Sequence, residues 1–387
     1  MHDRSVLGAA DVTDHQLREM VAAQLSPDTA CEVDLLDSAA EVVDYALPAL
    51  TTAGRFWVRG HARVSGDRVP FTFFVKHVQS WARSPLFAGV PPQLQEWAEA
   101  SVPWRTEPLI YRSDLAARLP VGLSMPRVFG VYDLDDRSAS VWLGEVLWTH
   151  ETWQLQRYSQ AAHLLGRLAA SPSVAGLARI ASHPGTVRDY LAGRLRYMVL
   201  PALHNDATWE HPLVSGAFDD DLRRRLLTLA DNCEALVEEL ASMPHLTGHG
   251  DACPNNLMVQ EGVDHFVLID YGFWGVHPVG FDLGQLLVGE IQIGRRPAAD
   301  MADLERSVLP AYLAGLHAEG SGISGDVVRR AHALQVAIFT ALSTIPFEHL
   351  GQDPTPELAQ LAGERATIAR FSLDLLDDTN RVTDCQK

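Results

Sequence analysis

Three side chains in the second half of the chain carry oxygen atoms that can bind a metal and accept a proton. Asp251 lies five residues before Asn256, and Asp270 follows at the end of an apolar run. Such oxygens suit Mg²⁺, which takes one or two carboxylates together with phosphate oxygens and water. Phosphoryl transfer needs a metal to neutralise the triphosphate and a carboxylate to orient and deprotonate the acceptor hydroxyl. The pattern therefore predicts that Asn256 and Asp270 hold metal and that Asp251 is the base.

The segment between Asn256 and Asp270 has the pattern of a β-hairpin. Two apolar runs flank a turn at Glu261 and Gly262. In an antiparallel pair centred near Val263, opposed residues are equidistant from the centre, which pairs Asn256 with Asp270. We expect the hairpin to place these two side chains next to each other at its open end.

Lysine is almost absent from the chain, so its one internal occurrence is informative. Of 31 basic residues, only Lys76 and Lys387 are lysine. Lys76 lies in an apolar run, residues 71–78, that is typical of a strand. Lysine is a compact point charge on a thin stem, whereas arginine is a wide planar fork. From this context alone two interpretations stay open: a site that requires an ammonium group, or an edge-strand lysine that faces water.

The first part of the chain is predicted to be a small antiparallel sheet with one inserted helix. A helical lead-in is expected over residues 1–45. Alternating apolar residues predict strands at 55–59, 61–64, 69–78, 127–132 and 140–144. Apolar spacing over residues 93–118 predicts the inserted helix.

From about residue 151 onward the pattern is mainly helical. Apolar residues at three- and four-residue steps predict helices over 151–170, 186–204, 220–242, 300–318, 325–346 and 355–377. One short β region at 257–270 interrupts them. The predicted fold class is therefore α+β, with a β-rich N-terminal lobe over residues 1–145 and a mainly helical C-terminal lobe over residues 146–387.

The order of these residues resembles the catalytic and metal-binding motifs of the aminoglycoside-phosphotransferase and choline-kinase family. The motifs are His249-x-Asp251-x-x-x-x-Asn256, Asp270-x-Gly272 and Gly280-Phe281-Asp282-Leu283. Because this family is similar in architecture to protein kinases, the resemblance implies a protein-kinase-like two-lobed fold. It also implies that Asp251 activates the acceptor hydroxyl, that Asn256 and Asp270 bind Mg²⁺, and that His249 and Asp282 hold the catalytic loop through hydrogen bonds.

The resemblance further implies a lysine in the third strand of the first lobe, paired with a glutamate from a helix. Lys76 is in that place, and Glu107 is our choice for its partner. Pro108 departs from a regular helix, but proline is tolerated in the first turn. Glu96 and Glu99 stay open as substitutes.

Two further segments match nucleotide-binding parts of the family. Thr51, Thr52 and Gly54 precede the first predicted strand and could form the hairpin that covers the phosphates. Glu145 and Leu147 follow the fifth strand and match the hinge between the lobes, whose backbone would bind the adenine edge.

The predicted function is transfer of the γ-phosphate of ATP to a hydroxyl of a small molecule, with GTP left open as donor. The acceptor could be an aminoglycoside, another antibiotic, a sugar or an amino alcohol. A nucleotide-binding pseudokinase with a regulatory role and a metal-dependent hydrolase using His249 and Asp251 are the alternatives. A P-loop kinase is excluded because Lys76 follows valine rather than glycine, and a nucleophile-elbow esterase lacks its GxSxG motif.

Composition narrows the partners and the compartment. The net charge of −18 argues against nucleic acid and anionic membranes. It would suit a cationic acceptor, but acidic residues at helical spacing are also typical of a solvated face. The acidic residues of the expected acceptor region are Glu290, Asp300, Asp303, Glu305 and Glu348. With no signal peptide, no membrane span and four scattered cysteines, we expect a cytoplasmic protein with reduced thiols.

Overall fold

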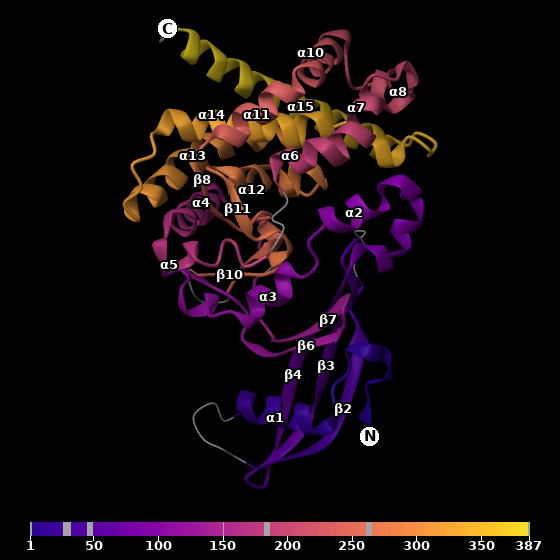
Figure 1. The fold of residues 1–387 in the computed structure, drawn as a ribbon, viewed down its shortest axis with the longest axis vertical. Coiled ribbons are helices and arrows are strands. Elements are labelled where there is room, and N and C mark those ends of the chain that lie inside the picture. The colour runs from indigo at the N-terminus through magenta and orange to yellow at the C-terminus, as the bar shows by residue number, and fades with distance from the viewer. Residues whose placement is uncertain are drawn as a thin grey trace.

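The computed structural model of the chain describes residues 2–25, 32–44, 49–149, 151–181, 186–260 and 265–385. These residues form a β-rich N-terminal lobe and a mainly helical C-terminal lobe, and the two chain ends lie at opposite ends of the molecule (Figure 1). The predicted α+β, two-lobed fold class is confirmed.

The N-terminal lobe is built on a six-stranded sheet with the order β1-β2-β3-β4-β7-β6. Its strands are β1 (His2–Asp3), β2 (Val33–Val42), β3 (Thr52–Val64), β4 (Asp67–Gln79), β6 (Val128–Asp135) and β7 (Ser138–Gly144). The neighbours pair antiparallel, except that β1 runs parallel to β2. Strand β4 pairs with β3 on one side and with β7 on the other, which places it in the interior of the sheet.

Alternation along β4 decides which residues face which core. Phe73 and Val75 point into the core that the sheet forms with helix α1 (Asp14–Leu25). Because successive side chains point to opposite faces of a strand, Phe74 and Lys76 point the other way. Phe74 packs against the second core, so Lys76 faces the side of the sheet that joins the C-terminal lobe.

This second core runs through both lobes. Val141 and Leu143 of β7 and Ile110 of α3 (Thr106–Arg112) belong to the same buried cluster as the helices of the C-terminal lobe. One face of the sheet is therefore covered by its own helix α1, and the other by α3 together with the C-terminal lobe.

Two sequence predictions for this lobe are wrong in part. The helical lead-in ends at α1, and β2 is a strand that pairs with β3 along its whole length. Its Ala- and Asp-rich sequence has weak strand propensity, so pairing with β3 decides its conformation. The helix expected over 93–118 is broken into α2 (Gln95–Ser101) and α3, with Pro103 in the break.

The C-terminal lobe contains every predicted helix, several of them interrupted. Its long helices are α4 (Leu155–Ala170), α10 (Asp220–Asp231), α11 (Cys233–Ser242), α12 (Phe281–Gln292), α13 (Met301–Ala318), α14 (Gly325–Gln335) and α15 (Pro356–Cys385). The segment predicted over 186–204 is α6 (Val187–Tyr190), a π-helix (Leu191–Val199) and α7 (Leu200–Leu203). Helix α12 is missing from the prediction.

Short strands in this lobe carry the motif residues. Strands β5 (Leu123–Ser124), β10 (Phe266–Leu268) and β9 (Leu257–Val259) form one small sheet, and β8 (His245–Gly248) pairs with β11 (Gly275–Pro278). Among the residues that the structure describes, no helix is long and apolar enough to cross a membrane.

The described thiols form no disulfide with one another. Cys233 and Cys253 are free and buried. Cys31 and the side chain of Cys385 lie outside the described residues.

Candidate active site at the junction of the lobes

Lys76 joins the two lobes through two carboxylates. Its Nζ lies 2.6 Å from Glu107 Oε2, on α3, and 2.9 Å from Asp270 Oδ1, at the end of β10. The Lys76 and Glu107 side chains are almost fully buried, whereas the Asp270 side chain is 40% exposed. The open alternative of an edge-strand lysine facing water is therefore wrong: β4 is an inner strand, and the ammonium is enclosed.

The protonation of this triad follows from burial and charge. Burial lowers the pKa of Lys76, but the Asp270 and Glu107 carboxylates outweigh it and raise this pKa. Burial raises the pKa of Asp270, but the Lys76 ammonium outweighs it and lowers this pKa. Burial raises the pKa of Glu107 to about 7 against the opposing effect of Lys76. Glu107 is therefore the member of the triad that titrates near neutrality.

The local sequence explains why Glu107 occupies this position. Glu107 and Pro108 lie in the first turn of α3, where a missing backbone N–H costs no helical hydrogen bond. The two substitutes lie on α2 instead. Glu99 accepts a hydrogen bond from Ser80 Oγ at 2.7 Å, and Glu96 is exposed. Of the three candidate glutamates, Glu107 is the one that contacts Lys76.

Two tyrosines outside the predicted site connect this helix to the segment after Asp270. Tyr111 lies one turn after Glu107, so both project from the same face of α3. Its ring meets the ring of Tyr271 edge-on, with centroids 5.4 Å apart. Burial raises the pKa of both phenols well above the ordinary value. The four-residue spacing from Glu107 is the signal that could have identified Tyr111.

Asn256 orients the proposed base. Its Nδ2 donates to the Asp251 carbonyl oxygen at 2.9 Å and to Asp251 Oδ2 at 3.0 Å. Burial raises the pKa of Asp251, and the Asp270 carboxylate raises it further, against the opposing effect of the neighbouring His249. The net upward shift makes Asp251 a better proton acceptor.

Asp282, at the start of α12, accepts hydrogen bonds from the backbone of the predicted catalytic loop. Its Oδ2 accepts from the backbone N–H of His249 at 2.9 Å, and its Oδ1 from that of Gly250 at 2.8 Å. The His249 Nε2 lies 2.9 Å from the carbonyl oxygen of Ile269. His249 is fully buried, and Nδ1 of its ring has no hydrogen-bond partner among the described residues. A structural role for His249 stays a prediction.

The register of the hairpin differs from the prediction by one residue. Leu257 pairs with Leu268, and the Ile269 N–H donates to the Asn256 carbonyl oxygen at 3.1 Å. Asn256 is therefore opposite Ile269 rather than Asp270. Asp270 leaves the strand with left-handed backbone angles, φ 63° and ψ 67°. The prediction assumed a centre at Val263, which lies, like the predicted turn, outside the described residues.

The oxygen donors fit a magnesium ion that arrives with phosphates. Asp270 supplies a carboxylate and Asn256 an amide oxygen, and Mg²⁺ takes its remaining ligands from phosphate and water. Within the described ranges there is no group of three or more His, Cys, Asp or Glu residues that could hold a metal alone. A site of this composition needs a bound nucleotide to complete the coordination.

The residues predicted to cover the phosphates begin β3, beside the strand that carries Lys76. Thr51 accepts a backbone hydrogen bond from Gln79 at 2.8 Å, Thr52 pairs with Val78, and Gly54 pairs near the end of β4. Residues 45–48, in the connection from β2, lie outside the described residues. A role for Thr51, Thr52 and Gly54 in phosphate binding stays a prediction.

The predicted hinge follows β7 directly. Glu145 and Leu147 are exposed. Two residues on, the Thr149 N–H donates to the Val259 carbonyl oxygen at 3.0 Å, which fixes the connection to β9. Both hinge residues, with Gln260, border a hollow of about 280 Å³. Adenine binding by this backbone stays a prediction.

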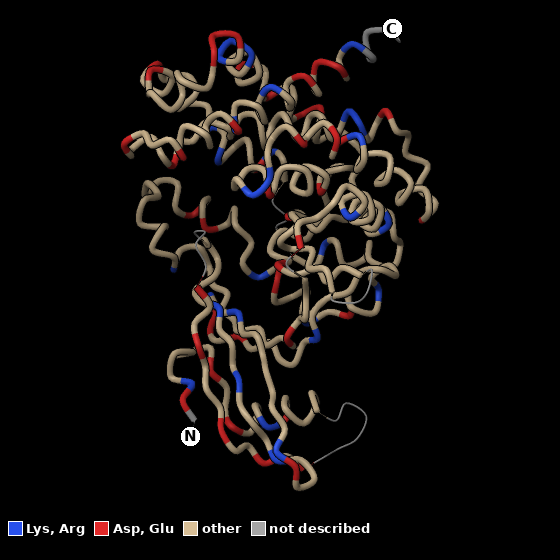
Figure 2. The backbone as a smooth tube through the Cα atoms, turned by 180° about the vertical axis from the view of Figure 1, so that it is seen from behind, with Lys and Arg blue, Asp and Glu red and all other residues tan. Residues whose placement is uncertain are grey.

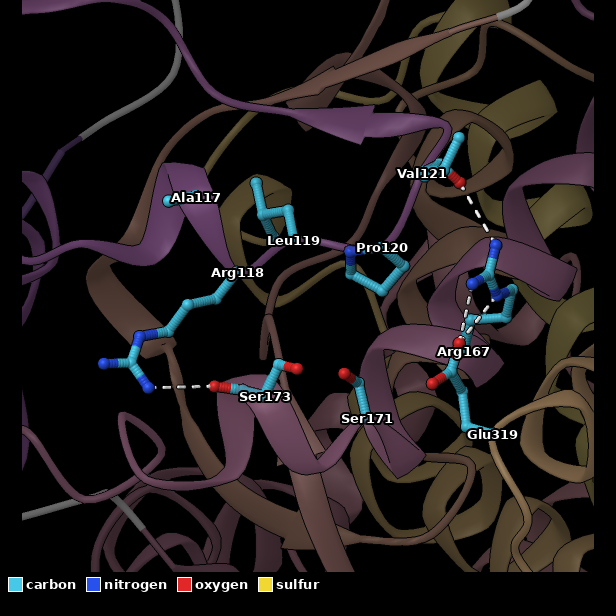
Figure 3. Close-up of a pocket in the computed structure, with 9 residues that line it drawn as sticks. All are labelled: Ala117, Arg118, Leu119, Pro120, Val121, Arg167, Ser171, Ser173 and Glu319. Atoms are coloured by element: carbon cyan, nitrogen blue, oxygen red, sulfur yellow. Dashed lines mark hydrogen bonds and ion pairs between the residues drawn. The ribbon is translucent and has the colours of Figure 1, made fainter.

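A hollow of about 430 Å³ lies between the segment after α3 and the ends of α4 and α13 (Figure 3). Its two arginines are already engaged. Arg118 pairs with Asp114, and Arg167 pairs with Glu319. None of its lining residues belongs to the proposed site, so this hollow is not part of the candidate active site.

The acidic residues of the expected acceptor region are mostly paired. Asp and Glu positions are spread over both lobes rather than gathered in one place (Figure 2). Asp300 pairs with Arg296 and Glu348 with Arg365. Glu290 accepts a hydrogen bond from the Tyr158 hydroxyl at 2.9 Å. These contacts reduce the negative charge available to a cationic acceptor.

Comparison with known proteins places the chain among phosphotransferases. The model of the family described as "Phosphotransferase enzyme family" matches residues 111–319, more than half of the chain. A search of curated protein sequences finds no significant match.

Several solved structures are similar to this chain. A choline kinase from Cryptosporidium parvum is 11% identical, with 90% of each chain covered and a TM-score of 0.46. An aminoglycoside phosphotransferase from Alicyclobacillus acidocaldarius is 13% identical, with 89% of this chain and 92% of that chain covered and a TM-score of 0.46. One from Streptomyces rimosus, in complex with ADP and streptomycin, is 16% identical, with 77% and 92% covered and a TM-score of 0.41.

Proposed function

Because the chain belongs to the phosphotransferase enzyme family, we propose that it transfers the γ-phosphate of ATP to a hydroxyl group of a small molecule. The observation that carries this proposal is the position of Lys76 Nζ, within 2.9 Å of a carboxylate from each lobe. A buried ammonium beside a carboxylate that could bind metal would let both cations neutralise the phosphates of a nucleoside triphosphate.

Lys76 and Glu107 form the phosphate-binding half of the proposed site. The ammonium group would contact the nucleotide phosphates, as the corresponding lysine does in this mode of phosphoryl transfer. Glu107 holds the ammonium at 2.6 Å from the other side, so the lysine reaches the phosphates from a fixed position.

Asn256 and Asp270 would hold Mg²⁺, which when bound neutralises the charge that develops on the transferred phosphoryl group. Asp270 also contacts Lys76 at 2.9 Å. This contact brings the carboxylate of the C-terminal lobe to the lysine of the N-terminal lobe, so that both can act on the same triphosphate.

Asp251 would act as the base. A P–O bond forms between the acceptor oxygen and the γ-phosphorus while the bond from this phosphorus to the ADP oxygen breaks, and the hydroxyl proton passes to Asp251. The two hydrogen bonds from Asn256 Nδ2 hold the Asp251 carboxylate and its backbone in one orientation, which is what positioning an acceptor hydroxyl requires.

The test of this function is a coupled ADP-release screen with both ATP and GTP against antibiotics, sugars and amino alcohols. We expect release that depends on Mg²⁺ and on one acceptor class. With that acceptor, Asp251→Asn should lower turnover about 10²- to 10⁴-fold while binding of the non-hydrolysable analogue AMP-PNP is retained.

Full turnover in the Asp251→Asn variant would exclude this residue as base. Nucleotide binding without turnover across the whole screen would instead favour the pseudokinase alternative.

A further inference from the structure

Residues 80–105, here called the α2 insertion, separate the two residues of the buried ion pair. The insertion starts four residues after Lys76 and ends two residues before Glu107. It contains α2, and Figure 1 shows this helix beyond the upper end of the sheet, next to the helical lobe. Any shift of the insertion therefore acts on β4 at one end and on α3 at the other.

Both ends of the insertion are fixed to the turn between β6 and β7. Near its start, Arg83 donates to Asp135 at 2.7 Å. At its end, Arg105 donates to the Asp136 carbonyl oxygen at 2.6 Å. These contacts anchor the ends of the insertion on the N-terminal lobe. Within α2, Glu99 adds a looser ion pair with Arg137 of the same turn at 3.6 Å.

The middle of the insertion lies outside both hydrophobic cores. Ala98 is the one residue of α2 that is fully buried, and it belongs to neither core. Trp81 and Phe87 meet edge-on at 5.5 Å and also lie outside both cores. A segment with so few apolar contacts to the main cores opens at low free-energy cost, so its position depends on individual contacts.

One such contact joins the insertion to the C-terminal lobe. The Trp97 ring of α2 lies 6.4 Å from the Tyr197 ring, centroid to centroid. Its edge sits against Gly193 so closely that a β-carbon there would be 1.6 Å from Trp97 Cη2. Gly193 is buried inside the π-helix Leu191–Val199, and π-helical turns are frequent at functional sites. Glycine is costly inside a helix, and this contact supplies a reason for it.

We propose that Trp97 is a positioning residue: by docking on Gly193 it holds the α2 insertion, and through it Lys76 and Glu107, in the arrangement that binds nucleotide. This inference rests on the proposed function. If docking favours nucleotide binding, linkage requires nucleotide to favour docking by the same factor. The π-helix of the C-terminal lobe and the phosphate site thereby influence each other without direct contact.

The test measures binding of AMP-PNP with Mg²⁺ by titration calorimetry in the full chain. Trp97→Ala should weaken binding about tenfold, a typical coupling between two sites, and Trp97→Phe should recover part of the loss. Gly193→Ala should weaken binding similarly, because its new methyl group displaces the indole. In the Trp97→Ala background, Gly193→Ala should have no further effect, since the ring it would strike is gone.

Hydrogen exchange supplies a readout that a purely structural contact would not change. AMP-PNP with Mg²⁺ should slow exchange of the α2 amides in the unaltered protein and not in Trp97→Ala. Unchanged affinity in both single variants, or additive losses in the double variant, would overturn the positioning role alone. An unaltered protein that binds no nucleotide would overturn the proposed function as well.

Discussion

At the scale of single residues, the proposed nucleotide binding depends on the Lys76–Glu107 pair. The ammonium is surrounded by carboxylates from two lobes, and burial raises the pKa of Glu107 to about 7. The charge of this carboxylate, and with it the strength of the pair, therefore changes near neutral pH.

The first prediction concerns this titration. Glu107 is charged above about pH 7 and protonated below it, so affinity for AMP-PNP with Mg²⁺ should fall as the pH drops through that value. A carboxyl pKa raised from 4.5 on folding also means that this group lowers the free energy of unfolding as the pH rises from about 4.5 to about 7. Calorimetric titrations across this range check the affinity.

Glu107→Gln is the control for this prediction, since its amide does not titrate. It should remove the acid limb of the affinity profile. An acid limb of the same midpoint in this variant would assign the titration to another group.

The second prediction separates stability from activity at the same pair. Lys76→Met leaves Glu107 buried without its cation, which costs about 3–5 kcal/mol in typical buried pairs, and thermal unfolding should show the loss. Adding Glu107→Leu removes the unpaired charge and should restore much of the stability. Nucleotide binding should stay lost in both variants, because the ammonium is absent from each.

The outcome that contradicts this prediction is a double variant as unstable as Lys76→Met alone. It would show that the stability lost in Lys76→Met does not come from a buried Glu107 carboxylate without its cation.

The order of the motifs predicted which residues form the candidate site. It did not predict the details that depend on local geometry, such as strand register. Glu107 could be chosen despite Pro108 because proline is tolerated in a first turn, and the structure places both residues there. The predicted pairing of Asn256 with Asp270 is wrong by one residue, because the register of a hairpin depends on the geometry of its turn. Tyr111 was missed because its contact with Tyr271 joins segments far apart in the sequence.

At the scale of elements, the start of α12 holds the predicted catalytic loop in place. Asp282 accepts two backbone hydrogen bonds from that loop, at His249 and Gly250. Gly250 has φ +83°, and a β-carbon there would lie 2.1 Å from the Phe273 carbonyl oxygen. The loop is therefore held in a conformation that only glycine adopts readily, and Asp282 supplies the hydrogen bonds that stabilise it.

The third prediction is that Asp282→Asn loosens this loop. One carboxylate oxygen becomes an amide N–H, so one backbone donor loses its acceptor at a cost of about 1–3 kcal/mol. Turnover should fall with stability, measured by thermal unfolding and ADP release. Asp326→Asn is the matched control, because Asp326 is an exposed acid in the first turn of α14 and should be neutral in both assays.

Apolar periodicity predicted the helices that bury one face. It did not predict a strand whose conformation depends on pairing with its neighbour. The helices of the C-terminal lobe follow their apolar stripes, and even the interrupted ones start near the predicted residue. Strand β2 has Ala39 and Ala40 among several acidic residues, so no alternation marks it. Its conformation comes from pairing with β3, which its own sequence does not encode.

At the scale of the molecule, the two lobes share one core, and the division expected between residues 145 and 146 stays a prediction. The α+β class and the order of the lobes followed from strand and helix patterns. The acceptor did not follow, because the acidic residues expected around it are largely paired with arginines. Charge composition therefore says little about what the second lobe binds.

The shared core also has a consequence for any attempt to isolate the nucleotide-binding half. Val141, Leu143 and Ile110 belong to one buried cluster with the helices of the other half. A fragment ending at the hinge would expose this apolar surface to water, so we expect residues 1–149 expressed alone to aggregate. Recovery as a soluble pair when residues 150–387 are co-expressed would support this, and a monomeric, folded fragment would contradict it. We therefore expect that recombination at the hinge would not yield a half that folds on its own.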